Sequence, residues 1–316
     1  MDKLSFVIPC YRSQDSVRGV LDKIAQTVEA DGRYDYEIIC VNDYSPDNTL
    51  DVLNKAADDN SKITVIDLSR NFGQHAALMA GFNYVTGDIV VCLDDDGQNP
   101  PEEMFKLIDK LNEGYDLVSA KYEDKKRSLF RKFGTKLSFF MSEWLINKPK
   151  DLDLNSYYAV KRFVVEETIK YKNAYPFVHG LMLRITRNMA NVMITHKTRE
   201  TGESGYSLTK LVSLWMNGFT AFSEKPLRIS SLIGGICAAI GFIMAIVVVI
   251  RKLLDPGIPL GYSAIMSAIM FMSGVNMLIL GLLGEYIGRM YICINNAPQF
   301  TVRSVKRGSQ NDDNNK

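Results

Sequence analysis

Five short apolar runs, separated by longer polar segments, constrain the fold of this chain more than any other feature of its sequence. Each run is five or six residues long, rich in Val and Ile, and almost continuously apolar. Such runs are typical of strands buried on both faces of a parallel sheet. The segments between them, residues 15–30, 48–59, 74–85 and 101–113, are each long enough for a crossover helix. The sequence therefore predicts an α/β fold with an open, mostly parallel sheet, whose strands are LSFVI, YEIICV, ITVIDL, DIVVCL and YDLVSA.

Two uncharged apolar segments, residues 229–250 and 262–283, lie near the C-terminal end of the chain. Each reaches about the 20 residues that a helix needs to cross the core of a bilayer. Both are longer than an ordinary buried helix of a soluble domain, and the Pro- and Gly-containing turn LDPGIPLG separates them. We therefore predict a two-helix transmembrane hairpin within residues 226–290.

The charges beside this hairpin predict its orientation. Lysine and arginine are more frequent at its two outer ends than beside its turn, and cytoplasmic flanks carry such an excess. The N-terminus, MDKLSFVIPCY, lacks the apolar core of a signal peptide. We expect a multi-pass protein of the cell (inner or plasma) membrane with both termini and the first domain in the cytoplasm. The outer-end cations are Lys225, Arg228, Arg289, Arg303, Lys306 and Arg307, and those beside the turn are Arg251 and Lys252.

The chain is predicted to comprise a cytoplasmic domain (1–225), a membrane region (226–290) and a cytoplasmic C-terminal tail (291–316), whose end, GSQNDDNNK, is polar and expected to be disordered. A basic amphipathic helix is expected to end near residue 146. Residues 207–222 have apolar side chains at helical intervals, which fits a helix lying at the membrane interface or one packed on the sheet. Glycines in the hairpin would allow close helix packing and a homo-oligomer.

Composition limits the classes of partner. The chain has 37 Lys+Arg against 36 Asp+Glu, so its net charge of +1 gives no reason to expect a nucleic-acid partner. Its five cysteines are scattered and form no CxxC pair, which favours buried thiols in a reducing compartment over a zinc site or a disulfide framework.

Polar residues follow the predicted strands at the edge where ligands bind in open α/β sheets. Asp43 comes directly after the second run, and Asp47 lies in the turn that follows. Their carboxylates could accept hydrogen bonds from a nucleobase or ribose, or could form Asx turns and helix caps. The sequence alone leaves both interpretations open.

The fourth run leads directly into three carboxylates, Asp94, Asp95 and Asp96, followed by Gly97 and Gln98. Three adjacent carboxylates repel one another unless a cation neutralises them, and hard oxygen ligands suit Mg²⁺ or Mn²⁺. Alternation along an extended chain directs Asp94 and Asp96 to one side and Asp95 to the other. We predict that Asp96 and Gln98 share a cation that bridges a diphosphate; a solvated acidic turn before a helix is the alternative.

The segments VIPCYRSQDSV, VNDYSPDNT, LSRNFGQHAALMAGFNYVTGDIVVCLDDDGQNPPEEM and GLLGEYIGRMY together resemble glycosyltransferase family 2, and within it the enzymes that act on polyprenyl phosphates. The resemblance covers nearly the whole chain. It implies a Rossmann-like GT-A fold and an inverting, metal-dependent transfer of a sugar from a nucleotide-sugar, expected to be a UDP-sugar, to undecaprenyl phosphate or a similar lipid.

By matching positions, the resemblance also implies roles for individual residues. The nucleotide-sugar would be held by Pro9, Tyr11, Asp43, Asp94 and Asp95, and the metal by Asp96, which also serves catalysis, and by Gln98.

Cations are required to hold two anionic substrates together. Arg131 lies in RSLFRKFG, which is similar to the family's phosphate-binding stretch, and is assigned a catalytic and acceptor-binding role; a solvated face or lipid head groups are the alternatives for Arg127. The full set assigned to the acceptor phosphate is Arg127, Arg131, Arg199, Ser156 and Tyr206.

The chain departs from the family pattern at several positions. Where many members have Asp-x-Gly-Asp/Ser-Phe-Arg, it has Asp153-Leu154-Asn155-Ser156-Tyr157-Tyr158. We assign Asp153 a catalytic role as a base or an orienting group. Tyr44 replaces the usual Gly after Asp43, and its ring either stacks near the base or caps the turn. His75, at a helix start, is expected to serve packing and capping.

Two rival functions are weighed against this one. A polysaccharide- or protein-directed family 2 transferase generally has a QxxRW-type motif and more membrane helices, and this chain has neither. A catalytically inactive membrane adaptor would have no physical reason to keep the costly cluster of acidic residues at 94–96.

Overall fold

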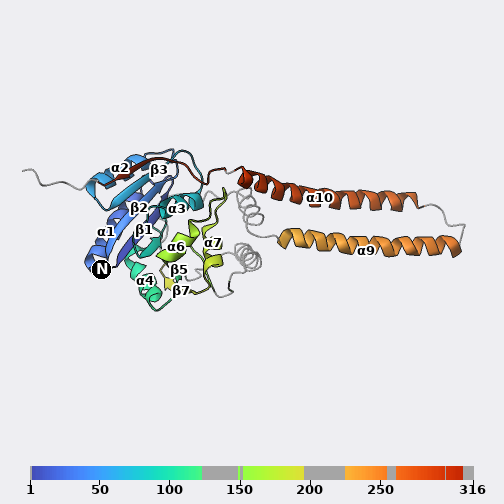
Figure 1. Cartoon of the computed structure of the whole chain (residues 1–316), viewed down its shortest axis with the longest axis horizontal. Coiled ribbons are helices and arrows are strands. Elements are labelled where there is room, and N and C mark those ends of the chain that lie inside the picture. The colour runs from blue at the N-terminus through green and yellow to red at the C-terminus, as the bar shows by residue number, and fades with distance from the viewer. Residues whose placement is uncertain are drawn as a thin grey trace, which may run out of the picture. The chain divides into compact units, whose positions relative to one another are not determined.

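The computed structural model describes residues 2–122, 149, 152–195, 225–254, 261–295 and 297–308 (Figure 1). The chain forms two units, one comprising residues 1–205 together with 296–316 and the other residues 206–295. The predicted helices near 125–146 and 207–222 lie outside the described residues.

The described part of the first unit contains an eight-stranded sheet in the order β7-β5-β6-β4-β1-β2-β3-β8. Only β6 and β8 run antiparallel to the other strands, so the sheet is mostly parallel, as predicted. The strands are β1 (Lys3–Cys10), β2 (Asp35–Asn42), β3 (Ile63–Leu68), β4 (Ile89–Cys92), β5 (Leu117–Tyr122), β6 (Tyr158–Lys161), β7 (Met189–Ile194) and β8 (Val302–Arg307).

Helices cover both faces of the sheet (Figure 1). Leu4, Phe6 and Ile8 of β1 belong to a core shared with α1, α2 and α4. On the other face α3 approaches so closely that a Cβ on Gly81 would lie 2.5 Å from Cγ1 of Val7. The helices of this unit are α1 (Val17–Asp31), α2 (Thr49–Asp59), α3 (Gln74–Phe82), the 3-10 helix η1 (Pro101–Glu103), α4 (Met104–Asn112), α6 (Arg162–Thr168) and α7 (Val178–Ile185).

The five predicted runs form β1 to β5, and the four segments between them contain α1, α2, α3 and the pair η1 and α4. We did not predict β6, β7 or β8 from the sequence. β6 is only four residues long, and β8, with the sequence VRSVKR, is mostly exposed, so neither has the apolar run that identified the other strands. β8 lies within the segment assigned to the C-terminal tail.

The second unit contains two long helices, α9 (Lys225–Leu254) and α10 (Tyr262–Ile294), which include the two predicted apolar segments. Among the described residues, Phe271–Ile294 is long and apolar enough to cross a membrane by length and composition. A shorter apolar stretch, Gly234–Ile243, lies in α9.

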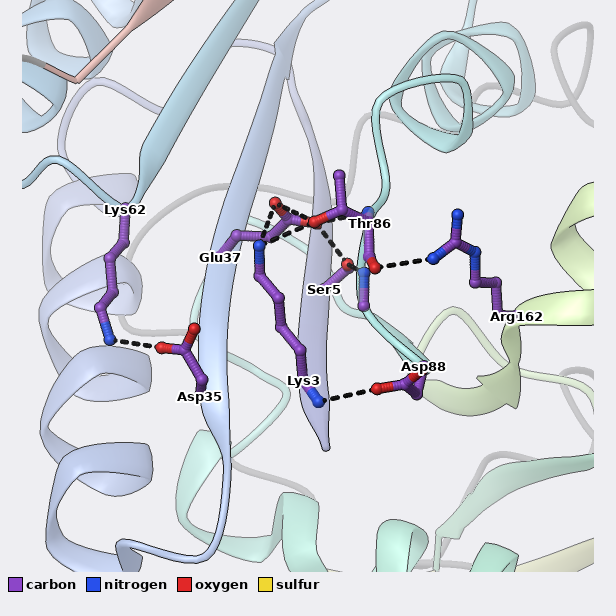
Figure 2. A network of polar contacts seen from close by, with 9 residues as sticks. Lys3, Ser5, Asp35, Glu37, Lys62, Thr86, Asp88 and Arg162 are labelled. Carbon is purple, nitrogen blue, oxygen red and sulfur yellow. Dashed lines mark hydrogen bonds and ion pairs between the residues drawn. The ribbon is translucent and has the colours of Figure 1, made fainter. Parts of the chain in front are cut away.

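A network centred on Glu37 holds the amino ends of the central strands together (Figure 2). Its carboxylate accepts hydrogen bonds from Lys3 Nζ at 3.0 Å, Ser5 Oγ at 2.6 Å and the Thr86 amide at 2.6 Å. Arg162 donates to the Thr86 carbonyl at 2.8 Å. Burial raises the pKa of Glu37, but these hydrogen bonds outweigh it and lower the pKa below its usual value. The network fixes the amino ends of the central strands, at the side of the sheet opposite the polar residues that follow the strands.

Candidate active site

The polar residues that follow the strands gather at one side of the sheet, at the carboxyl ends of the parallel strands. β1 pairs in parallel with both β2 and β4, so the residues that follow Cys10, Asn42 and Cys92 leave the sheet at the same edge. β6 runs antiparallel to β4, and therefore the residues that precede Tyr158 arrive at this edge too. This arrangement brings the predicted Asp43, Asp94–Asp96 and Ser156 to one side of the fold.

Asp94 joins three elements. Gln74 at the start of α3 donates from Nε2 to Asp94 Oδ1 at 2.9 Å, and Asn99 donates from Nδ2 to Oδ2 at 3.3 Å. The hydroxyl of Ser156, which precedes β6, donates to the same Oδ2. Burial raises the pKa of Asp94, and these hydrogen bonds oppose that rise. Tyr122 donates to Asn99 Oδ1 at 2.6 Å and so orients that amide.

Asp95 contacts a different part of the chain. Its Oδ2 accepts the Tyr11 amide at 3.0 Å, and its carbonyl oxygen accepts the Ser16 hydroxyl at 2.8 Å. Burial raises the pKa of Asp95 to about 6, and the charges of Asp94 and Asp96 add to the rise. Asp94 and Asp95 thus bind different elements, as strand alternation predicts, and Asp95 fixes the loop between β1 and α1.

Asp96 and Gln98, the two residues predicted to hold the metal, lie together in the loop after β4. The Gln98 amide donates to Asp96 Oδ1 at 3.0 Å, and Gly97 between them has a φ of 74°, which a residue without a Cβ adopts at no steric cost. No group of three or more His, Cys, Asp or Glu side chains that could hold a metal ion occurs in the described ranges. The carboxylate and amide oxygens of this pair fit Mg²⁺ or Mn²⁺, which commonly completes its coordination with water and substrate phosphate.

Asp43 is buried and holds the loop that leads into α3. Its carboxylate accepts the amides of Phe72 at 2.7 Å and Gly73 at 2.8 Å, and its carbonyl oxygen accepts Asn71 Nδ2 at 3.2 Å. Burial raises the pKa of Asp43, and the two amides oppose the rise. Because the next residue after this loop is Gln74, Asp43 also sets the position from which Gln74 reaches the acidic cluster.

Asp47 acts as a turn residue. Its Oδ1 accepts the Thr49 hydroxyl at 2.6 Å and the Thr49 amide at 3.2 Å, and it also accepts the Ser45 hydroxyl. Burial raises its pKa, but these hydrogen bonds outweigh it, and the pKa lies below the usual value. Of the two interpretations that the sequence left open, the contacts of Asp47 fit the turn and cap.

Exposed aromatic rings flank this edge. The residues after β1 and β2, Tyr11 and Tyr44, are 44% and 49% exposed. Arg12 and Tyr44 have φ angles of 56° and 53°, in the left-handed region that non-glycine residues rarely adopt. Pro9 lies opposite Val41 within the paired strands β1 and β2.

Asp153 lies beside a lysine at the start of the segment that leads to β6. Its Oδ2 is 3.4 Å from Lys121 Nζ, and its backbone is held by Asn191, which accepts the Asp153 amide at 2.8 Å and donates to the Asp153 carbonyl at 2.7 Å. Tyr158, which occupies the position of the family's arginine, is fully buried and packs against His179. The segment therefore presents no guanidinium at that position.

The predicted acceptor residues Arg127, Arg131, Arg199 and Tyr206 lie outside the described residues. We did not predict the contributions of Gln74 and Asn99. The signal available was weak, because each is a single amide residue: the tertiary structure brings Gln74 to Asp94, and the path of the loop after β4 brings Asn99 there.

His75 packs in a cluster of partly buried rings, as expected from the sequence. Its ring centroid is 5.1 Å from that of Phe177 and 6.1 Å from that of His179. Burial lowers the pKa of His75 to about 3, with a further contribution from His179, and burial lowers the pKa of His179 to about 4.

Comparisons with known proteins show the family of this chain. The model of the family described as Glycosyl transferase family 2 matches residues 5–169, and that described as GtrB C-terminal hairpin matches residues 225–290. Proteins named undecaprenyl-phosphate 4-deoxy-4-formamido-L-arabinose transferase, from Yersinia pestis (strain Pestoides F) and Yersinia pseudotuberculosis serotype O:3 (strain YPIII), are each 35% identical to the chain. The alignments cover 99% of this chain and 96% of each relative.

Solved structures share the fold at low sequence identity. Mannosyl-3-phosphoglycerate synthase from Rubrobacter xylanophilus matches with a TM-score of 0.55 and 19% identity, covering 68% of this chain and 71% of that one. Glucosyl-3-phosphoglycerate synthase from Mycobacterium tuberculosis, in complex with Mn²⁺, UDP and phosphoglyceric acid, matches with a TM-score of 0.51 and 20% identity, covering 74% and 78%. The resemblance found in the sequence is confirmed by the match across nearly the whole chain, and the chain belongs to glycosyltransferase family 2.

Proposed function

We propose that this chain transfers a sugar from a nucleotide-sugar, a UDP-sugar, to undecaprenyl phosphate or a closely similar polyprenyl phosphate. The product is a lipid-linked monosaccharide for modification of cell-envelope glycans. One observation carries the proposal: the likeness to undecaprenyl-phosphate transferases extends over 99% of the chain, and family models match both the sheet domain and the C-terminal hairpin. A soluble donor and a lipid acceptor require both a nucleotide site and a membrane anchor.

The proposed reaction is a single displacement with inversion. An oxygen of the lipid phosphate forms a bond to the anomeric carbon, and the bond from that carbon to the β-phosphate oxygen breaks. The electron pair leaves with the nucleoside diphosphate. A strong general base is not required, because the lipid phosphate is already an anion near neutral pH.

The acidic residues that follow β4 supply the part of the site that binds the donor. Asp96 and Gln98 would hold Mg²⁺ or Mn²⁺, which stabilises the charge that develops on the leaving diphosphate. The Mn²⁺ and UDP in the mycobacterial synthase structure support the use of a divalent metal ion together with a nucleotide. Asp94 and Asp95 hold the surrounding loops in place through their contacts with Ser156 and the Tyr11 amide. Pro9, Tyr11 and Asp43, together with Asp94 and Asp95, are proposed to hold the nucleotide-sugar.

Basic residues form the proposed part of the site that binds the acceptor. Arg127, Arg131 and Arg199, with Tyr206, are proposed to bind the lipid phosphate and to hold it in line with the anomeric carbon. Asp153 is proposed to orient the acceptor, with Lys121 beside it at 3.4 Å. The hairpin is proposed to cross the membrane twice, with both termini in the cytoplasm, where soluble nucleotide-sugars are available.

The test is transfer of radiolabelled sugar from a panel of UDP-sugars into an organic-extractable product. Membranes that contain the full chain are supplied with undecaprenyl phosphate and Mg²⁺ or Mn²⁺. Asp96→Ala removes the proposed metal ligand, and Asp35→Ala is the matched control, because Asp35 is an aspartate at the opposite edge of the same sheet (Figure 2).

We expect lipid-linked label with the wild type and with Asp35→Ala, and its loss with EDTA or with Asp96→Ala. NMR of the anomeric configuration of the product should show the opposite anomer to the donor. Label in a polymer or protein fraction instead would favour the polysaccharide- or protein-directed rival. Nucleotide binding with no transfer to any acceptor would favour the inactive adaptor.

A further inference from the structure

Arg303 in strand β8 follows the hairpin in the sequence. In the structure it lies beside the carboxyl end of the neighbouring strand β3. β8 pairs antiparallel with β3, and the Ser69 amide after β3 donates to the Thr301 carbonyl at 2.9 Å. β8 thus runs along β3, whose carboxyl end lies next to Asp43 and its loop. A residue that follows the membrane helices is in this way brought to the donor side of the sheet.

The pairing of β8 with β3 contains an irregularity at Arg303. Ser304 stands opposite Asp67 and Val302 stands opposite Leu68, so Arg303 is an extra residue between two adjacent pairs. Such bulges change the direction of a side chain and are over-represented next to active sites. The bulge directs the Arg303 guanidinium to the end of β3.

Three groups surround that guanidinium. Nη1 is 3.5 Å from Oδ2 of the buried Asp67, and Nη2 donates to the Ser69 carbonyl at 3.0 Å. Its Cζ lies 5.0 Å from the centroid of the Tyr44 ring, within the range of a cation–π contact. Asn42 donates to the other oxygen of Asp67 at 2.8 Å, so Asp67 is a fixed anchor for the arginine.

Tyr44 provides an independent observation. It has a φ of 53°, at the position where the family usually has Gly. A bulky residue in this conformation strains the backbone, and such residues persist where the surroundings hold them and cluster at ligand sites. Its ring is nevertheless half exposed, next to the buried Asp43. The exposed ring of Tyr44, held by a guanidinium, offers an apolar face to a planar ligand.

We propose that Arg303 is a positioning residue that fixes the Tyr44 ring as a stacking face for the nucleobase of the donor. The inference rests on the proposed function, because it assigns the nucleoside part of the same site. It makes the strand after the membrane hairpin part of the donor site.

The test uses the full chain in detergent or nanodiscs. Binding of UDP, GDP, CDP and dTDP to the wild type is measured first by calorimetry, and the tightest of them is then used for Arg303→Ala, Tyr44→Gly and the double variant. Arg307→Ala is the matched control, because Arg307 is an arginine of the same strand opposite Thr64, toward the other end of β3. Thermal unfolding is recorded for every variant.

We expect Arg303→Ala and Tyr44→Gly each to weaken nucleotide binding about five- to tenfold, a size typical of one aromatic contact. The KM for the donor should rise by a similar factor, with kcat and the KM for the lipid within about twofold. The double variant should bind the nucleotide no less tightly than the single variant with the lower affinity, because Arg303 acts through Tyr44. Tyr44→Gly should unfold at a higher temperature than the wild type although it binds less tightly, which a purely structural role for Tyr44 would not produce.

Unchanged binding in Arg303→Ala, or equal loss in Arg307→Ala, would overturn the inference and leave the proposed function intact. Additive losses in the double variant would also overturn it. If the wild type binds none of the four nucleotides, the proposed function fails, and the inference with it.

Discussion

At the scale of single residues, the site depends on carboxylates that are held by donors from several elements. Asp94 receives Gln74 from α3, Asn99 from the following loop and Ser156 from the segment before β6. A buried carboxylate that loses a donor keeps its desolvation cost, so each contact matters more than an exposed hydrogen bond would.

Ser156→Ala tests this dependence. We expect the variant to lose about 1–2 kcal/mol of unfolding free energy, since a charged group loses a hydrogen bond, and about tenfold in kcat/KM. Ser156→Thr retains the hydroxyl and should stay close to the wild type. Chemical denaturation and the lipid-transfer assay measure the two effects, and equal values for Ala and wild type would show that Asp94 does not need this donor.

The two partly buried histidines, His75 and His179, predict a pH dependence of stability. The folded-state pKa values of His75 and His179, about 3 and about 4, lie below the unfolded value of about 6.5. The unfolded state therefore binds protons more readily between these limits, so stability is complete above about pH 6.5 and falls as the pH drops toward 3.

His75→Leu should reduce this loss. Between pH 7.5 and 5.5 each of the two histidines is expected to contribute about 1 kcal/mol of lost stability. Asp95 titrates in the same range with the opposite sign, so the comparison between the variant and the wild type isolates His75. Denaturant unfolding at the two pH values measures the slope, and an identical loss in both proteins would contradict the expectation.

At the scale of elements, close backbone approaches fix the packing of the sheet. Gly87, just before β4, donates its amide to Ser5 Oγ at 2.8 Å. A Cβ at this position would lie 2.5 Å from the Lys3 carbonyl oxygen and 2.7 Å from Ser5 Oγ. The backbone of β1 cannot move away without disturbing its pairing with β2 and β4.

Gly87→Ala is therefore expected to lower the unfolding free energy by about 1–3 kcal/mol through overpacking. Gly19→Ala is the matched control: Gly19 lies in α1 with open space around its Cβ position, and alanine is favoured over glycine in a helix by about 1 kcal/mol. The two substitutions should shift the thermal midpoint in opposite directions. A Gly87→Ala variant as stable as the wild type would show that the strands adjust more easily than the geometry implies.

At the scale of the whole molecule, the sheet is completed by a strand that follows the hairpin in sequence. β3 would have an open edge without β8, and Asp67 would lose the arginine beside it. A chain cut before the hairpin therefore lacks part of its own catalytic unit.

This organisation predicts the behaviour of truncated chains. Residues 1–224 alone should aggregate and unfold at a lower temperature than a chain in which residues 297–316 follow residue 224 through a flexible linker of about 20 residues, which spans roughly 25 Å. Size-exclusion chromatography and thermal unfolding measure the difference. Equal stability of the two chains would mean that β8 contributes little to the sheet.

The sequence by itself determined the central strands, the parallel α/β architecture and the family, because strands buried on both faces produce apolar runs and because the acidic and hairpin motifs are local. It also located the positions of Asp43 and Asp94–Asp96 at strand ends. Their partners could not be predicted: Gln74 and Ser156 meet Asp94 only through strand order and crossover geometry, and the contact of Asn99 depends on the path of the loop after β4.

The tertiary structure alone decided the place of β8 and Arg303. An exposed edge strand such as VRSVKR has no apolar run, and its stability comes from backbone hydrogen bonds with β3 rather than from local pattern. The direction of the Arg303 side chain depends on a one-residue bulge in that pairing, and no property of the linear sequence specifies such a register.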